Sequence, residues 1–220
     1  MHKYILCVLF IIGLTSPASA ACQINSPYKQ GEYAAQILDF VAGYWISMLG
    51  ENAIDYGITF REKKPLHMFR LINPGARVLG CPKTSLDNAL TLGHEGYVIV
   101  GPKNCFRNGP GPDILVHEPR TDINTNESFN VYITEDYKGK GPWYKVASEQ
   151  TVASSNNFLE IDISGIKTER GYPLEEFTWV KIEDANSQVV LSNRRYSGFD
   201  VSAVQFLHPC RINVSLLDLR

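Results

Sequence analysis

Short runs of β-branched and aromatic residues, separated by glycine, proline, asparagine and aspartate, make up most of this chain. In residues 129–134 apolar and polar positions alternate, which places Phe129, Val131 and Ile133 on one face of a strand. The turn-rich segment 136–142 predicts a hairpin from this strand to the next. The predicted strands cover residues 97–100, 114–116, 129–134, 143–147, 158–163, 177–182 and 201–206. This regular succession of short strands and turns predicts an all-β fold, an antiparallel β-sandwich or jelly roll.

Residues 32–40 differ from the rest, because alanine and aliphatic residues recur there at mixed spacing. The pattern predicts a short N-terminal helix or irregular segment, with a strand as the alternative. No internal repeat or long linker divides the chain. We therefore expect a single β-sandwich domain over residues 21–220.

The first 20 residues have the pattern of a secretory signal peptide, with Lys3 before an apolar core and small residues at 18–20. We expect cleavage after Ala20. No later segment approaches the roughly 20 apolar residues of a transmembrane helix. The pattern predicts a secreted protein, periplasmic or extracellular, without a transmembrane segment. A lipoprotein anchored through Cys22 is the alternative, although the usual leucine three positions before that cysteine is missing.

The expected mature chain keeps four cysteines, an even number that predicts two disulfides in an oxidising compartment. Three pairings are open. We favour Cys22 with Cys210, which would tie the two ends, and Cys81 with Cys105, which would close a local loop. The sequence contains no Cys-x-x-Cys element, so a zinc or thioredoxin-like redox site has little support.

The charge balance argues against a general nucleic-acid partner. The chain has 21 basic and 23 acidic residues, and its net charge of −2 becomes −3 when Lys3 is removed with the signal. A protein that binds the phosphate backbone is expected to have a basic surface.

Two acidic residues come directly before predicted strands. Asp113 follows the rigid segment Gly109-Pro110-Gly111-Pro112, and Asp200 follows Gly198 and Phe199. Together with Glu118 they are candidate calcium ligands, because hard cations prefer carboxylate oxygens. An extended segment 113–118 would separate its two acids by roughly 16 Å. The three acids therefore cannot all bind the same ion. Either Asp200 pairs with one of the others, or each acid caps backbone donors at a corner.

Aromatic residues flank the turn at residues 138–141 and suggest a platform for a sugar ring. The candidates are Tyr137, Trp143 and Tyr144, and the two tyrosines are expected to be more exposed. Trp143 and Trp179 are expected to pack in the sandwich.

The order of motifs extends over most of the mature chain. It comprises residues 37–43, the element Ala76-Arg77-Val78-Leu79-Gly80-Cys81-Pro82, a glycine-rich strand at 90–100, the Gly-Pro-Gly-Pro-Asp corner with residues 115–118, residues 131–143, Asp162-Ile163-Ser164-Gly165, residues 177–184 and the closing Gly198-Phe199-Asp200-Val201-Ser202-Ala203-Val204. This order resembles a family of exported bacterial cell-surface proteins, many of which carry C-terminal sorting signals. The resemblance implies a galactose-binding-like β-sandwich.

The chain departs from that family at three points. His117 stands where an aromatic residue is usual, and Ser202 stands where a second aspartate is frequent. The sequence ends at Arg220 without a hydrophobic anchor or basic tail, so we expect no attachment through a sorting signal.

These features predict a secreted, non-catalytic binding or surface-interaction module whose ligand is unidentified. A calcium-dependent carbohydrate-binding protein, with a glycan or cell-surface ligand, is the first alternative. The second is a secreted hydrolase whose site would assemble from distant residues. Its fragments would be His94-Glu95, His117-Glu118 and His208, and no catalytic motif joins them.

Overall fold

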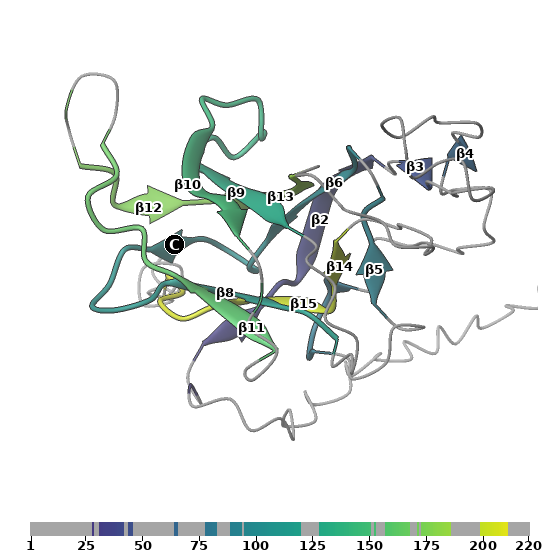
Figure 1. The fold of residues 1–220 in the computed structure, drawn as a ribbon. Coiled ribbons are helices and arrows are strands. Elements are labelled where there is room, and N and C mark those ends of the chain that lie inside the picture. Colours follow the sequence, from purple (N-terminus) through teal and green to yellow (C-terminus); the bar gives the residue numbers. More distant parts are fainter. Residues whose placement is uncertain are drawn as a thin grey trace, which may run out of the picture.

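A computed structural model describes residues 28, 31–41, 44–45, 64–65, 78–82, 89–93, 95–119, 128–150, 152, 157–167, 171, 173–185 and 199–210. The described part is built from antiparallel sheets that pack together, as the sequence predicted (Figure 1). The four-stranded sheet A contains, in spatial order, β1 (Glu32–Tyr33), β15 (Ala203–Phe206), β8 (Ile114–His117) and β11 (Phe158–Ile161). The five-stranded sheet B contains β10 (Tyr144–Gln150), β9 (Phe129–Thr134), β13 (Trp179–Asp184), β6 (Tyr97–Gly101) and β2 (Gln36–Val41).

Three short strand pairs complete the described architecture. In Figure 1 the pair that contains β12 stands at the left of the two layers, and the pair β3–β4 stands at the upper right. The pairs are β14 (Asp200–Val201) with β5 (Leu90–Thr91), β12 (Glu176–Phe177) with β7 (Phe106–Arg107), and β3 (Tyr44–Trp45) with β4 (Lys64–Pro65).

The hydrophobic core lies between sheets A and B. The predicted inward residues Phe129, Val131 and Ile133 are fully buried there, and Ile114 and Val116 face them from β8. Aromatic contacts close both ends of the core: the Phe129 and Phe199 rings lie 4.0 Å apart, and the Phe106 and Phe206 rings lie 4.8 Å apart. The core is the main stabilising feature of the sandwich, because burial of apolar surface drives folding.

The prediction of an N-terminal helix at residues 32–40 is wrong, since the segment forms β1 and β2. These strands belong to different sheets, and the chain crosses between the layers at the two alanines that separate them. Ala34 N donates to Val204 O of sheet A (2.8 Å), and Ala35 N donates to Gly101 O of sheet B (2.9 Å). Pairing with distant strands thus outweighs local helix propensity. Among the described residues no helix is long and apolar enough to cross a membrane.

The predicted strand at 201–206 is interrupted at Ser202. Both Ser202 and Ala203 lie opposite His117: Ser202 N donates to His117 O (2.8 Å), while Ala203 is the register partner of His117. Two residues against one is a β-bulge, which bends the strand. The bend lets β14 leave sheet A and pair with β5. The predicted strand at 177–182 is likewise divided, at Thr178, into β12 and β13.

Candidate functional site

Asp113 is a buried corner residue whose carboxylate binds two backbone donors. Its side chain is fully buried, Gly109 N donates to Oδ1 (2.7 Å), and Ile163 N donates to Oδ2 (2.9 Å). Burial raises the pKa of Asp113, and the two N–H bonds oppose that rise. His208 Nε2 lies 3.8 Å from Oδ1. Because both oxygens are engaged, Asp113 has the structural capping task that was one of the two sequence-based alternatives.

Glu118 and Asp200 come together at the opposite end of β8. Burial, with a smaller contribution from the charge of Asp200, raises the pKa of Glu118 to about 7. Burial also raises the pKa of Asp200 to about 6, against the effect of a hydrogen bond from the Thr91 hydroxyl to its Oδ1. The backbone contacts of Ser202 and Ala203 with His117 place the Asp200 segment at the Glu118 end of β8, away from Asp113.

His117 takes the packing place of an aromatic residue. Its buried ring lies 6.2 Å from the Tyr33 ring and 5.6 Å from the Phe158 ring, and Nε2 lies 3.4 Å from Gln205 Oε1. Burial lowers the pKa of His117 to about 4, so the ring is neutral near pH 7.

The fragments of the hydrolase alternative are not brought together. His117 and His208 lie at opposite ends of the paired strands β8 and β15, and His94 is outside the described residues. Within the described part of the chain, no serine, threonine or cysteine side chain hydrogen-bonds to His117 or His208. The hydrolase alternative gains no support from this geometry.

The predicted sugar platform does not form as a group of three. Tyr137 is 70% exposed, with Lys138 Nζ 5.2 Å from its ring centre. Tyr144 is the register partner of Ile133, is partly buried and packs against the core. The reason is strand alternation: as the first residue of β10, Tyr144 points between the sheets. Trp143 is partly buried.

Trp179 is buried as expected, but on the outer face of sheet B. Its Nε1 donates to Tyr137 O (2.9 Å), and a Cβ added at Gly139 would meet Leu38 and approach Trp179. The loop of residues 135–143 therefore covers one end of this outer face, and the close approach requires glycine at position 139.

The rest of the outer face of sheet B carries a group of side chains that sequence reasoning missed. One register row crosses all five strands and consists of Asp39, Ile99, Lys181, Tyr132 and Lys145. In the neighbouring row, Tyr97 pairs with Glu183 and Glu183 pairs with Asn130. We call Tyr97, Tyr132, Lys145 and Lys181 the Tyr–Lys ladder.

Cations and aromatic rings alternate along the Tyr–Lys ladder. Lys145 Nζ lies 5.2 Å from the Tyr132 ring centre, and Lys181 Nζ lies 5.1 Å from the same ring and 4.8 Å from the Tyr97 ring. Contacts of this kind contribute about 0.5–1 kcal/mol each at exposed sites. The ladder is therefore a pre-ordered surface with two ammonium groups and two phenols.

Acidic and amide groups border the Tyr–Lys ladder. Tyr97 OH donates to Asp39 Oδ2 (2.8 Å), Lys145 Nζ lies 3.4 Å from Asn130 Oδ1, and Lys181 forms an ion pair with Glu183. The face thus offers hydrogen-bond donors and acceptors beside flat rings. It carries no large excess of either charge, because two ammonium groups stand beside two carboxylates.

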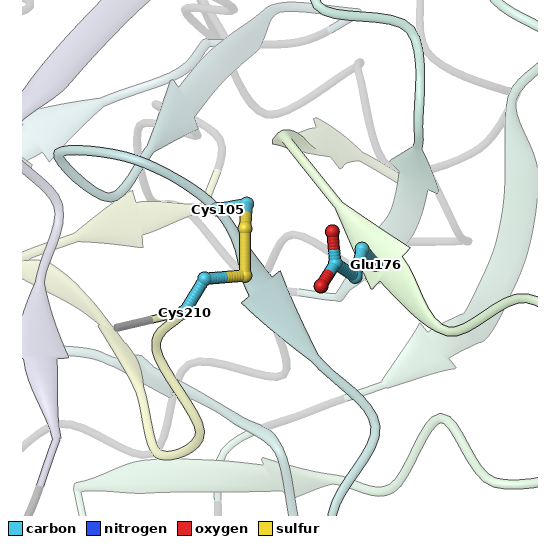
Figure 2. A group of neighbouring side chains, drawn as sticks. All are labelled: Cys105, Glu176 and Cys210. Carbon is cyan, nitrogen blue, oxygen red and sulfur yellow. A yellow bond between two sulfur atoms is a disulfide. The ribbon is translucent and has the colours of Figure 1, made fainter. Parts of the chain in front are cut away.

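Figure 2 shows the cluster of Cys105, Cys210 and Glu176, whose potential ligand atoms lie within 4.8 Å of one another. The two sulfur atoms are bonded to each other in a disulfide. Thiolate, the metal-binding form of cysteine, is therefore absent from this cluster. Glu176 is exposed and faces Arg107 at 3.9 Å.

The predicted disulfide pairing is wrong. Cys210 is bonded to Cys105, so neither Cys22–Cys210 nor Cys81–Cys105 exists in this structure. The pairing follows from sheet geometry: Phe106 and Pro209 form a β-bridge, and Cys210 N donates to Cys105 O (2.8 Å). Cys81 is also in a disulfide, while Cys22 lies outside the described residues.

Peptide mapping of the unreduced mature protein tests this pairing. We expect a cross-linked peptide pair containing Cys105 and Cys210, and a second pair in which Cys81 is linked to Cys22, the one other cysteine left after the expected cleavage. Mass spectrometry before and after reduction identifies both pairs. Recovery of a Cys22–Cys210 peptide, or of four free thiols, would contradict the expectation.

Comparison with known proteins assigns no family to this chain. No family model matches it, and no curated protein matches it either. The likeness in motif order to exported bacterial cell-surface proteins therefore stays a prediction.

Proposed function

We propose that this protein is a secreted, non-catalytic binding module that binds a glycan across the outer face of sheet B. The observation that carries the proposal is the Tyr–Lys ladder, which crosses four neighbouring strands and has Lys181, Tyr132 and Lys145 at aligned positions. Sugars are recognised by flat aromatic groups together with side chains that donate and accept hydrogen bonds. The ladder and its bordering Asp39 and Asn130 supply both.

The outer face of sheet A is less suited to this role. Leu115, His117 and Gln205, which point outward from β8 and β15, are all buried. A ligand could reach them only after displacing the groups that cover them. The partly exposed side chains of sheet B need no such rearrangement.

The Cys105–Cys210 disulfide and the signal-like N-terminus support export of the module. Calcium-dependent glycan binding is a second candidate, and it requires a cation site among the described acids.

Substitution of the ladder tyrosines tests the proposed function. On a glycan array, we expect the double variant Tyr97→Ala/Tyr132→Ala to lose binding to the glycans that the wild type binds. Affinity measured by calorimetry for the best glycan should fall at least about tenfold, which corresponds to about 1.4 kcal/mol. Lys145→Met, which keeps the aliphatic stem of an exposed side chain, should weaken binding less.

Tyr137→Ala is the matched control, because Tyr137 is an exposed tyrosine outside the ladder. It should retain wild-type binding, and circular dichroism should show that all variants are folded. Unchanged affinity in the double variant would refute the ladder as the binding face. Loss of binding in Tyr137→Ala alone would favour the turn at residues 138–141 instead.

A further inference from the structure

Three residues with oxygen-bearing side chains, Glu118, Asp200 and Ser202, lie where β14 bends into β15, beside the end of β8. Phe199 and Val201 point into the core, so alternation places Asp200 and Ser202 on the other side of their segment. Ser202 N is hydrogen-bonded to the carbonyl oxygen of His117 (2.8 Å), the residue just before Glu118. The three residues therefore lie together at this end of β8. The charge of Asp200 also contributes to the raised pKa of Glu118.

In the described part of the chain, no positive charge balances the two carboxylates. Among the described residues, neither Glu118 nor Asp200 has a lysine, arginine or histidine within ion-pair distance. Asp200 is buried, and its one side-chain hydrogen bond comes from the Thr91 hydroxyl. A buried carboxylate without a counter-charge is costly unless it binds a cation or a proton.

Ser202 gives an independent indication of a missing partner. The residue is fully buried, and its Oγ has no hydrogen-bond partner in the described structure. An unsatisfied buried hydroxyl costs roughly 1–3 kcal/mol, so native proteins seldom retain one without a bound group that it contacts. Its lone pairs are suitable ligands for a hard cation.

We propose that Glu118, Asp200 and Ser202 bind a divalent cation of the calcium class. Two carboxylates and one hydroxyl supply three to five of the six to eight oxygens that calcium takes, and water or backbone carbonyls would complete the shell. Thr91 acts as a positioning residue, since its hydroxyl donates to Asp200 Oδ1. Asp113 is not part of this site, because its two oxygens accept backbone N–H groups.

Calcium is favoured over magnesium because the donors come from irregular strand ends and include a neutral hydroxyl. Magnesium demands near-octahedral geometry and keeps several of its waters, whereas calcium tolerates irregular sets of oxygen ligands. Bound calcium would balance both carboxylates and satisfy Ser202.

Thermal unfolding of the mature protein with intact disulfides, in calcium and in chelator, tests the site. For the wild type we expect the melting temperature to rise with calcium concentration, by about 5 to 10 °C at 100 times the dissociation constant. Magnesium at the same concentration should shift it less. Titration calorimetry with calcium alone should give one site per chain.

Three variants separate a cation site from a merely structural acid pair. Glu118→Gln should lose the calcium-dependent shift, yet in chelator it should be at least as stable as the wild type, because one unbalanced carboxylate is gone. Ser202→Ala should remain folded and bind calcium several-fold more weakly. Asp162→Asn, an exposed acid elsewhere, should keep the full shift.

Absence of a calcium-dependent shift in the wild type, or an equal shift in Glu118→Gln, would overturn the proposal. The wild type could show no calcium-dependent shift while Glu118→Gln unfolds at a higher temperature than the wild type in chelator. That combination would show instead that the two acids share a proton. Either result would leave the proposal of a glycan-binding face on sheet B unaffected, because that proposal is tested by glycan affinity and not by the melting temperature.

Discussion

Replacing both Cys105 and Cys210 with alanine should lower the free energy of unfolding by about 4 kcal/mol. The two residues are 105 positions apart, and a cross-link over so long a loop strongly restricts the unfolded chain. In the folded state the bond joins the segment before β7 to the segment after β15, next to the Phe106–Pro209 bridge. Denaturant unfolding under non-reducing conditions measures the change, and the melting temperature should fall by roughly 8 to 16 °C.

The double variant is preferable to chemical reduction, because a reducing agent would also open the disulfide of Cys81. A matched control is Arg107→Ala, which removes an exposed side chain beside the same bridge and should change stability little. A loss of less than about 1 kcal/mol in the double variant would show that the surrounding strand contacts hold the chain end without the bond.

Sequence patterns predicted the strands well where alternation was clean. The predicted strand 129–134 coincides with β9, and its partner β10 begins one residue after the predicted start. In β9 the predicted inward residues Phe129, Val131 and Ile133 are fully buried, whereas β10 has two register shifts, and the adjacent residues Val146 and Ala147 both pack against the core. At residues 32–40 the local pattern was ambiguous, and the choice between helix and strand depended on pairing with β15 and β6, which no local pattern encodes.

The disulfide pairing failed for the same reason. Cys105 and Cys210 meet because the segments that carry them lie side by side in the fold. Spacing along the chain favours a short loop, but a sandwich brings distant segments together at its ends.

The candidate sites were predicted in part. Sequence reasoning singled out Asp113, Glu118 and Asp200 and expected the first two to lie apart, and β8 is indeed extended between them. It missed the Tyr–Lys ladder, whose members come from four strands. Alternation in β9 marks Tyr132 as outward, but only the register between strands aligns it with Lys145 and Lys181.

Asp113→Ala should lower the free energy of unfolding by about 2 to 5 kcal/mol, since it leaves two backbone N–H groups without their acceptor. The donors are Gly109 N in the Gly-Pro corner and Ile163 N beyond β11, so the carboxylate joins two segments that are distant in sequence. Removing it should loosen the corner and the end of sheet A together. Urea denaturation gives the change in stability, and hydrogen exchange should show faster exchange at Gly109 and Ile163.

Two further variants separate this capping role from a general effect of charge. Asp113→Asn keeps the shape and one acceptor oxygen, so its loss of stability should lie between those of the wild type and Asp113→Ala. Asp162→Ala removes an exposed carboxylate that accepts Ser164 N within a local turn (2.7 Å), and its loss should be much smaller. If Asp113→Ala were no more destabilising than Asp162→Ala, the buried corner would not depend on its acid. The Gly-Pro segment would then hold its conformation through backbone restriction alone.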